Sequence, residues 1–208
     1  LSITAVIVVC LMLTVASYYA AHRWEEQAFQ SEFDRRANNH AADLQAKIDL
    51  HMELLESIAG LFKSFDSVER ANFSKFVMPF LENYKEVQGY SWNPVIKFSE
   101  RTRIEEAARQ QGFKDFRFTE LSDSGTRKTA SQRDEYVTVF YLEPLSGNEQ
   151  ALGFDISSEV VRRRAIVEAR ESGAAATTQW IRLVQEQESQ FGILVLRPVY
   201  SSDAKPDS

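Results

Sequence analysis

The stretch YLEPLSGNEQALGFDISSE, Tyr141–Glu159, decides how the fold is interpreted. A polar turn, SGNEQ, separates two apolar segments, and the second segment ends on Asp155 directly before a predicted helix. A strand, a turn and a returning strand predict antiparallel pairing. A carboxylate at this position either caps the following helix, where a negative charge is favourable by about 0.3–1 kcal/mol, or anchors a ligand. Ser157 and Ser158 could cap the same helix, so both interpretations stay open.

Further strands and helices are expected on both sides of this stretch. Short turns between neighbouring strands predict an α+β fold, with an antiparallel sheet and helices on one side of it. Ser67 and Ser99 are the expected N-caps of two helices, and Gly112 and Gly173 are the expected helix ends. Strands are expected at Val87–Phe98, Lys114–Leu121, Glu135–Pro144, Ala151–Phe154, Thr177–Glu186 and Phe191–Tyr200, and helices from Asp66, over 99–111 and over 156–172.

A long amphipathic helix is predicted over residues 23–65. The segment from Trp24 to Phe65 has no proline, and its first glycine is Gly60. Apolar residues recur there in steps of three and four, which is the period of a helix with one apolar face. Because this apolar face is longer than that of a typical globular helix, we expect it to pack against a second copy of the chain as a stalk that forms a homodimer.

Residues 1–22 are predicted to form a transmembrane helix. Leu1–Ala21 carries no charge, and about 20 residues at roughly 1.5 Å each span the hydrocarbon core of a bilayer. Tyr18 and Tyr19 fall near its end, where aromatic belts lie. A cleaved signal peptide is the alternative, although the apolar segment is long for one. The chain opens inside this helix, so we expect it to be a piece of a larger membrane protein.

Composition argues against several classes of function. The 208 residues carry a formal net charge of −6, and an acidic surface repels nucleic acid. One cysteine and three histidines, all in the N-terminal part, make up no metal-ligand set. No Ser/His/Asp set, GxGxxG or P-loop is present. We therefore expect no enzyme activity, no cofactor and no nucleic acid partner.

Two groups of residues could bind a ligand but also have an ordinary structural explanation. Tyr90 and Trp92 could stack on a flat ligand, but aromatic residues in strands more often belong to the core. The run Arg162-Arg163-Arg164 could bind an anion, but such a run is more often a solvated helix face. We interpret the aromatic pair as core and the arginines as surface.

Several motifs occur together in a recognisable order. They are GYSWNPVI, EYVTVFYLEP, ALGFD, RRRAIVEARESG, IRLVQE and FGILVLRPVY, between Gly89 and Tyr200. In order and spacing the chain resembles CHASE domains, the extracytoplasmic sensor modules of cytokinin-receptor histidine kinases and of bacterial histidine kinases and cyclases. The resemblance implies a long stalk helix followed by two PAS-like subdomains over residues 66–200, the membrane-distal one holding the ligand. Residues 201–208 would then lead to a second transmembrane helix.

The resemblance also implies a binding site. In the plant cytokinin receptors an aspartate at the end of this strand bonds the hormone, and the matching position here is Asp155. In those receptors a leucine also contacts the hormone through its backbone, and the matching position here is Thr177. The side chain differs, but a backbone contact does not depend on it. From their strand positions, Tyr136, Phe140, Ile193 and Val195 are expected to line the wall, with Trp180 also near Asp155.

The predicted function is an extracytoplasmic ligand sensor in the inner membrane of a cell, facing the periplasm. A small molecule in the distal pocket would shift the domain and its stalk within a homodimer, and relay the signal to a histidine kinase or diguanylate cyclase. The alternative is a module that binds a periplasmic protein or peptide, or that only holds a constitutive dimer.

Overall fold

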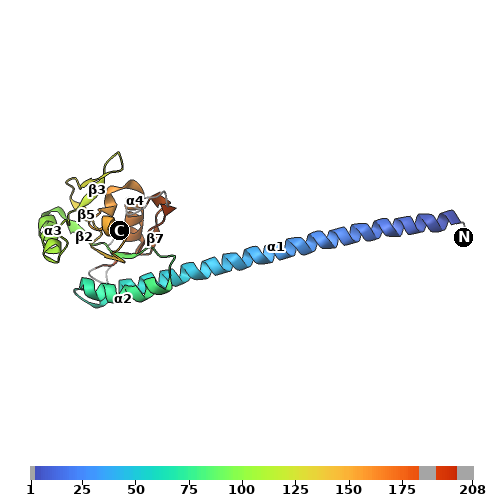
Figure 1. Ribbon diagram of the computed structural model, residues 1–208, viewed down its shortest axis with the longest axis horizontal. Helices are drawn as coiled ribbons and strands as arrows, with labels where there is room; N and C mark the ends of the chain where they lie inside the picture. Colours follow the sequence, from blue (N-terminus) through green and yellow to red (C-terminus); the bar gives the residue numbers. More distant parts are fainter. Residues whose placement is uncertain (1–2, 183–190, 201–208) are drawn as a thin grey trace. The chain divides into compact units, whose positions relative to one another are not determined.

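The computed structural model describes residues 3–182 and 191–200 (Figure 1). It divides into two compact units, Leu1–His51 and Met52–Ser208. Helix α1, Ile3–Ser64, makes up the described part of the first unit and its last turns belong to the second. The prediction of one long helix is thus confirmed. None of the helices described is both long enough and apolar enough to cross a membrane, and the membrane helix at residues 1–22 stays a prediction.

The centre of the second unit is an interrupted antiparallel ribbon. Strand β1, Tyr90–Trp92, pairs with β6, Tyr141–Glu143, and β2, Val95–Lys97, pairs with β5, Glu135–Val137. The register places Trp92 opposite Tyr141 and Ile96 opposite Tyr136. Between the two pairs, the backbone N–H of Phe140 donates to the Trp92 carbonyl at 2.9 Å. The ribbon thus keeps its direction across the interruption.

Residues 98–134 leave the ribbon at Lys97 and return at Glu135, which is the register partner of Lys97. This insertion contains the 3₁₀ turn η1, Phe98–Glu100, helix α3, Arg101–Gln110, and the hairpin of β3, Thr119–Leu121, with β4, Arg127–Thr129. The insertion and the ribbon share a buried apolar cluster made of Ile96, Ala108, Phe116, Phe118, Ala130 and Tyr136.

The C-terminal part packs against the β5–β6 side of the ribbon. Turns η2, Glu149–Ala151, and η3, Ile156–Ser158, precede helix α4, Val160–Ser172, which ends at Gly173 with a left-handed φ of 68°. Strand β7, Ala176–Thr177, pairs with β10, Val195–Leu196, and β8, Ile181–Arg182, pairs with β9, Phe191–Gly192. A second buried cluster contains Val137, Val139, Leu142, Ala151, Phe154 and Ile156.

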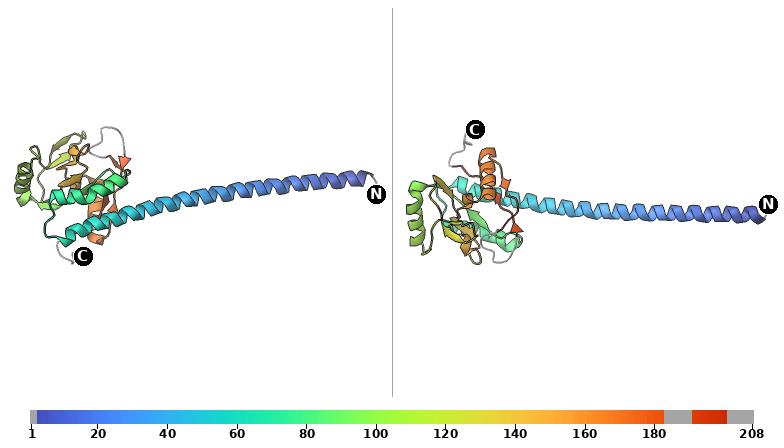
Figure 2. Two further views of the ribbon diagram at one scale, coloured as in Figure 1. Left: turned by 60° about the horizontal axis from the view of Figure 1, so that its bottom comes forward. Right: turned by 90° about the horizontal axis from the view of Figure 1, so that it is seen from above.

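Helix α2, Arg70–Asn83, lies alongside the last turns of α1 (Figure 2). Phe73, Val77 and Leu81 of α2 are buried with Ile58 of α1 and Tyr90 of β1. Phe76 and Phe80 are partly buried against the same cluster. This third cluster joins the end of α1 to the ribbon.

The α+β class and antiparallel strand pairs are confirmed, while several expected elements are wrong. The strand expected at Ala151–Phe154 is absent: turn η2 ends at Ala151, and Phe154 makes only an isolated bridge. The strand expected at Glu135–Pro144 breaks between β5 and β6, because Pro94 stands opposite the break and has no N–H to donate to a ladder. The helix expected over 156–172 divides into η3 and α4. Glu69 and Glu100, rather than Ser67 and Ser99, occupy the N-cap positions of α2 and α3.

Arg162 was expected on a solvated helix face and lies instead in the protein interior, with 3% of its surface exposed. Its guanidinium donates to the Arg182 carbonyl at 2.9 Å, pairs with Glu159 and lies over the Phe154 ring. Arg163 and Arg164 are exposed as expected. Burial lowers the pKa of Arg162, and the charge of Glu159 opposes that change.

Candidate functional site: an aromatic cavity beside the ribbon

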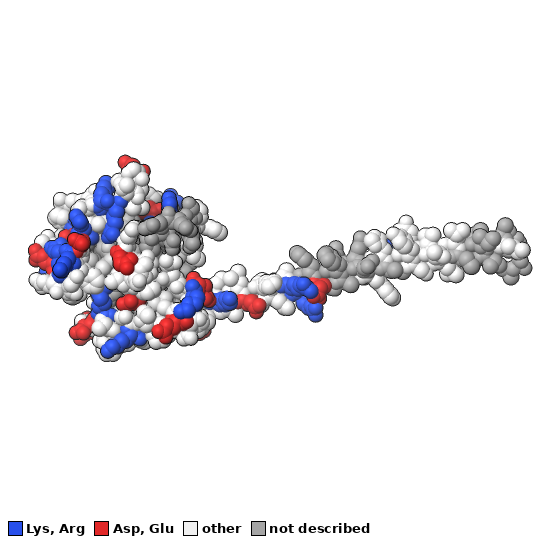
Figure 3. Space-filling view, viewed as in Figure 1, with Lys and Arg blue, Asp and Glu red and all other residues white. Residues whose placement is uncertain are grey.

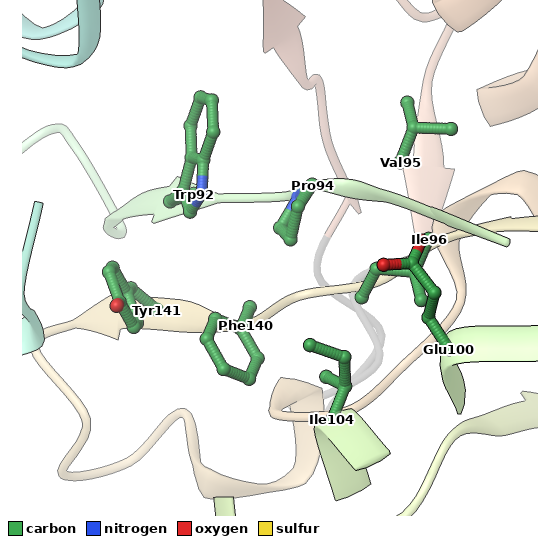
Figure 4. Close-up of a pocket in the computed structure, with 8 residues that line it drawn as sticks. All are labelled: Trp92, Pro94, Val95, Ile96, Glu100, Ile104, Phe140 and Tyr141. Carbon is green, nitrogen blue, oxygen red and sulfur yellow. The ribbon is translucent and has the colours of Figure 1, made fainter. Parts of the chain in front are cut away.

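A cavity of about 260 Å³ opens between the ribbon and the start of α3 (Figure 4). Its residues come from β1 and β2, from the turn between them, from η1 and α3, and from the start of β6. Trp92 and Tyr141 are register partners, so the β1–β6 pairing itself brings two aromatic rings to one side of the cavity. The lining residues are Trp92, Pro94, Val95, Ile96, Glu100, Ile104, Phe140 and Tyr141.

Seven of the eight lining side chains are aromatic or aliphatic, and the eighth, Glu100, is a carboxylate. Glu100 is the N-cap residue of α3, and its Oε1 accepts a bond from the exposed Arg103 at 3.2 Å. In Figure 4 the Glu100 side chain lies beside Ile96 and is directed toward the interior of the ring of lining residues. Apolar walls with few polar groups are typical of small-molecule sites, which usually measure about 300–1,000 Å³. This cavity lies just below that range.

Two of the lining aromatic residues also contact the helices behind them. The Trp92 ring stacks on Phe62 of α1, with centroids 3.8 Å apart and 12° between the planes. The Tyr141 hydroxyl donates to the carbonyl of Val68, just before α2, at 3.0 Å. Burial raises the pKa of the Tyr141 hydroxyl, although the charge of Arg70 lowers it. The cavity wall is therefore continuous with the end of the stalk helix.

Arg70 occupies an aromatic setting next to this wall. Its guanidinium lies 4.2 Å from the Phe113 ring centroid and 4.7 Å from that of Tyr141, and it donates to the Phe140 carbonyl at 2.6 Å. Burial lowers its pKa, whereas the charges of Tyr141 and Glu143 raise it. Arg70 therefore holds α2 against the strand segment that carries two of the cavity residues.

Asp155 is fully buried and hydrogen-bonded on both oxygens. Its Oδ1 accepts bonds from the Val137 N–H at 3.1 Å, the Ser157 N–H at 3.0 Å and the Ser157 hydroxyl at 2.6 Å. Its Oδ2 is paired with Arg133. Asp155 is the N-cap of η3, so the capping interpretation is confirmed for that turn. A ligand that bonded this carboxylate would have to replace one of these partners.

Arg133 joins Asp155 to a second buried carboxylate, Glu120. Glu120 also accepts from the Ser131 hydroxyl at 2.7 Å and pairs with Lys128 at 3.2 Å. Burial by itself would raise the pKa of Glu120, but the hydrogen bonds from Ser131, Arg133 and Lys128 outweigh it and lower the pKa to about 2. The network fastens the β3–β4 hairpin and the residues after it to the start of η3.

The structure does not bring the six predicted site residues together. Phe140 lines the cavity. Tyr136 is fully buried in the core, where its hydroxyl bonds Ser131, Arg101 and the Arg133 backbone. Thr177 and Val195 pair across β7 and β10, and Ile193 is 56% exposed. Trp180, expected beside Asp155, is 79% exposed.

Sequence reasoning missed most of the cavity. The interpretation of Tyr90 and Trp92 as core is confirmed, since Tyr90 is buried in the third cluster and Trp92 packs against it. Trp92 also lines the cavity, which was not predicted, and neither was Glu100. A usable signal was the Asn93-Pro94 pair, because a proline inside a strand pattern marks an interrupted ladder, where side chains are not packed in the regular way. No group of three or more His, Cys, Asp or Glu residues in the described part of the chain could hold a metal ion.

The fold and the site define a class of protein: an α+β domain with small antiparallel sheets, a long N-terminal helix and an aromatic cavity. Residues 66–208 match the CHASE domain, and the chain belongs to that family of sensor modules. CHASE domains are sensory and not catalytic.

The chain is also similar to part of a curated protein. The chain is 22% identical over 153 residues to hybrid signal transduction histidine kinase A of Dictyostelium discoideum. The match covers 72% of this chain and 7% of that kinase. The chain thus corresponds to a small part of its relative, in keeping with one sensor module.

Proposed function

We propose that this chain is the extracytoplasmic sensor of a transmembrane receptor and that a small molecule binds in the cavity beside the ribbon. The observation that carries the proposal is the cavity itself, which has three aromatic and four aliphatic lining residues around one carboxylate. Of the residues predicted from the sequence, Phe140 contacts the ligand in this proposal. Contacts by Asp155, Thr177, Tyr136, Ile193 and Val195 stay predictions.

The signal would leave the cavity through its aromatic wall. A ligand that favours one position of Trp92 also favours one position of Phe62, because the two rings are stacked. Phe62 belongs to the last turns of α1, so the ligand would bias the stalk helix. In a homodimer joined through that helix, in an inner membrane with the sensor in the periplasm, the bias would reach a histidine kinase or diguanylate cyclase.

Exposed apolar residues favour a second candidate, a module that binds a protein or peptide. Trp180, Phe191 and Ile193 are 79%, 66% and 56% exposed, and exposed apolar groups often mark interaction sites. On the face of the molecule seen in Figure 3, acidic and basic side chains are interspersed. No single charge dominates that face, so charge alone would not select the partner.

The test is a thermal-shift screen of the whole chain, in detergent, against a panel of metabolites. A ligand at 100 times its dissociation constant stabilises by about 2.7 kcal/mol, or a few degrees for a chain of this size. The blocking variant is Val95→Trp, since Val95 lines the cavity and is 53% exposed. Val160→Trp is the matched control, because Val160 is 52% exposed and lies on α4.

We expect a compound that raises the unfolding temperatures of the wild type and of Val160→Trp equally and does not change that of Val95→Trp. A compound that shifts all three proteins equally would place the site elsewhere. If no compound shifts the wild type, the protein-binding candidate is favoured, and a screen for bound peptides replaces the metabolite panel.

A further inference from the structure

The cavity has one ionisable side chain whose charge is available to a ligand. Glu100 supplies this carboxylate. The Tyr141 hydroxyl is already bonded to the Val68 carbonyl, and burial raises its pKa. The other lining side chains are uncharged. The formal charge of the lining side chains is therefore negative, and the nearest cation behind the wall is Arg70, 4.7 Å from the Tyr141 ring centroid.

The aromatic lining has the same preference. Trp92, Phe140 and Tyr141 line the cavity, and the faces of such rings carry the negative part of the ring quadrupole. A cation within about 6 Å of a ring centroid is attracted to the face, with tryptophan the strongest partner. Proteins that recognise ammonium groups combine such rings with a carboxylate. An anion would meet repulsion from both components.

The aliphatic lining residues determine which kind of ligand body fits beside the charged group. Pro94, Val95, Ile96 and Ile104 offer no hydrogen-bonding side chain. A polar body would find no hydrogen-bond partner among these four side chains, which disfavours its burial against them. The volume of about 260 Å³ restricts the ligand to a small molecule. The ligand body should therefore be compact and apolar.

We infer that the cavity binds a small organic cation, an amine with an aromatic or aliphatic body, whose nitrogen pairs with Glu100. This inference rests on the proposed function and names its ligand class. Arg103, which is exposed, pairs with the same carboxylate at 3.2 Å and competes for Glu100. Arg70 already lies over the Tyr141 and Phe140 rings, so Trp92 is the ring left for the ligand cation. The ligand ammonium shares Glu100 with Arg103 or replaces it.

The test compares three probes of nearly equal size and different charge: phenethylamine, 2-phenylethanol and phenylacetate. Their dissociation constants are measured by calorimetry on the whole chain at pH 7. Phenethylamine is expected to bind about five- to tenfold more tightly than the alcohol, which corresponds to a charge-assisted bond and a cation–π contact at a partly solvated site. Phenylacetate should bind most weakly.

Two variants identify the charge responsible. Glu100→Gln should lower the affinity for phenethylamine to that for 2-phenylethanol. The affinity for 2-phenylethanol should stay the same. Glu106→Gln is the control, since Glu106 is exposed on α3 and does not line the cavity. Arg103→Gln should strengthen phenethylamine binding, because the competing cation is removed.

Equal or tighter binding of the alcohol or the acid, binding of none of the three probes, or an amine affinity that survives Glu100→Gln would overturn the inference. None of these outcomes decides the proposed function, because the metabolite screen with Val95→Trp tests any ligand class. A neutral or anionic metabolite blocked by Val95→Trp would retain the sensor proposal and reject the organic cation.

Discussion

Trp92 stacks directly on Phe62, with ring centroids 3.8 Å apart and 12° between the ring planes. One residue lines the cavity and the other belongs to the end of α1. The ring centroids of Phe62 and Phe73 of α2 are 6.0 Å apart, and those of Phe73 and Tyr141 of the cavity wall are 5.8 Å apart. Four aromatic residues therefore join the two helices to the cavity through two separate contacts.

The stack should contribute to stability as a measurable pair. In a double-mutant cycle of Phe62→Ala and Trp92→Ala, we expect a coupling free energy of about 0.5–1.5 kcal/mol, the usual value for an aromatic pair. Urea unfolding followed by circular dichroism measures it. A second cycle of Phe62→Ala with Trp180→Ala is the control, because Trp180 is 79% exposed. A coupling no larger than that of the control would contradict the stack.

Gly153→Ala should destabilise the protein far more than Gly125→Ala. Both glycines have left-handed φ angles, 78° and 76°, so both substitutions carry the backbone strain of about 1–2 kcal/mol. A Cβ at Gly153 would lie 2.4 Å from the Arg117 carbonyl oxygen, whereas one at Gly125 meets nothing within 4 Å. Thermal unfolding of the two variants tests this, and equal losses would show that the close approach is absent.

Asp155→Asn should cost about 3 kcal/mol of unfolding free energy, because it removes the negative charge that faces Arg133 in the interior. The matched control is Glu135→Gln, which removes one partner of the exposed pair Arg170–Glu135, 2.9 Å apart. Exposed pairs contribute about 0–1 kcal/mol. If Asp155→Asn unfolds no more easily than Glu135→Gln, the Arg133 pair contributes little.

The depressed pKa of Glu120 predicts that stability falls in acid. The ordinary pKa is 4.5 and the folded value is about 2, so the contribution is complete above pH 4.5 and is lost as the pH falls toward 2. At 1.36 kcal/mol per pH unit it amounts to at most about 3 kcal/mol. Urea midpoints between pH 7 and pH 2.5 measure the loss.

Glu120→Gln supplies the comparison for the pH series. The variant should be less stable than the wild type at pH 7, and the difference should narrow below pH 4. A difference that stays constant over the whole range would show that Glu120 is not the group that titrates.

The sequence was sufficient for features that depend on local periodicity. Steps of three and four residues predicted the long helix over residues 23–65, which lies within α1. Gly173 was correctly predicted as a helix end, because its left-handed φ is a local requirement. These predictions succeed because each concerns residues that lie within a few positions of one another.

The cavity could not be predicted in this way. Its two halves, residues 92–104 and 140–141, meet only because β1 pairs with β6 across a long insertion. Alternation along a strand shows which side chains share a face, but it does not show which strand lies opposite. The burial of Arg162 could not be predicted for the same reason, because its hydrogen-bond partner is the Arg182 carbonyl on a separate strand.

Lys97 and Glu135 face each other across the ribbon, so residues 98–134 begin and end at adjacent points. Exposed positions of this insertion can change without altering the ribbon, whereas Phe116 and Phe118 are buried in the cluster shared with it. The insertion supplies Glu100 and Ile104 to the cavity, while the ribbon supplies the aromatic rings. Substitutions at Glu100 or Ile104 would therefore change the charge or size of the cavity and leave the Trp92–Phe62 contact in place.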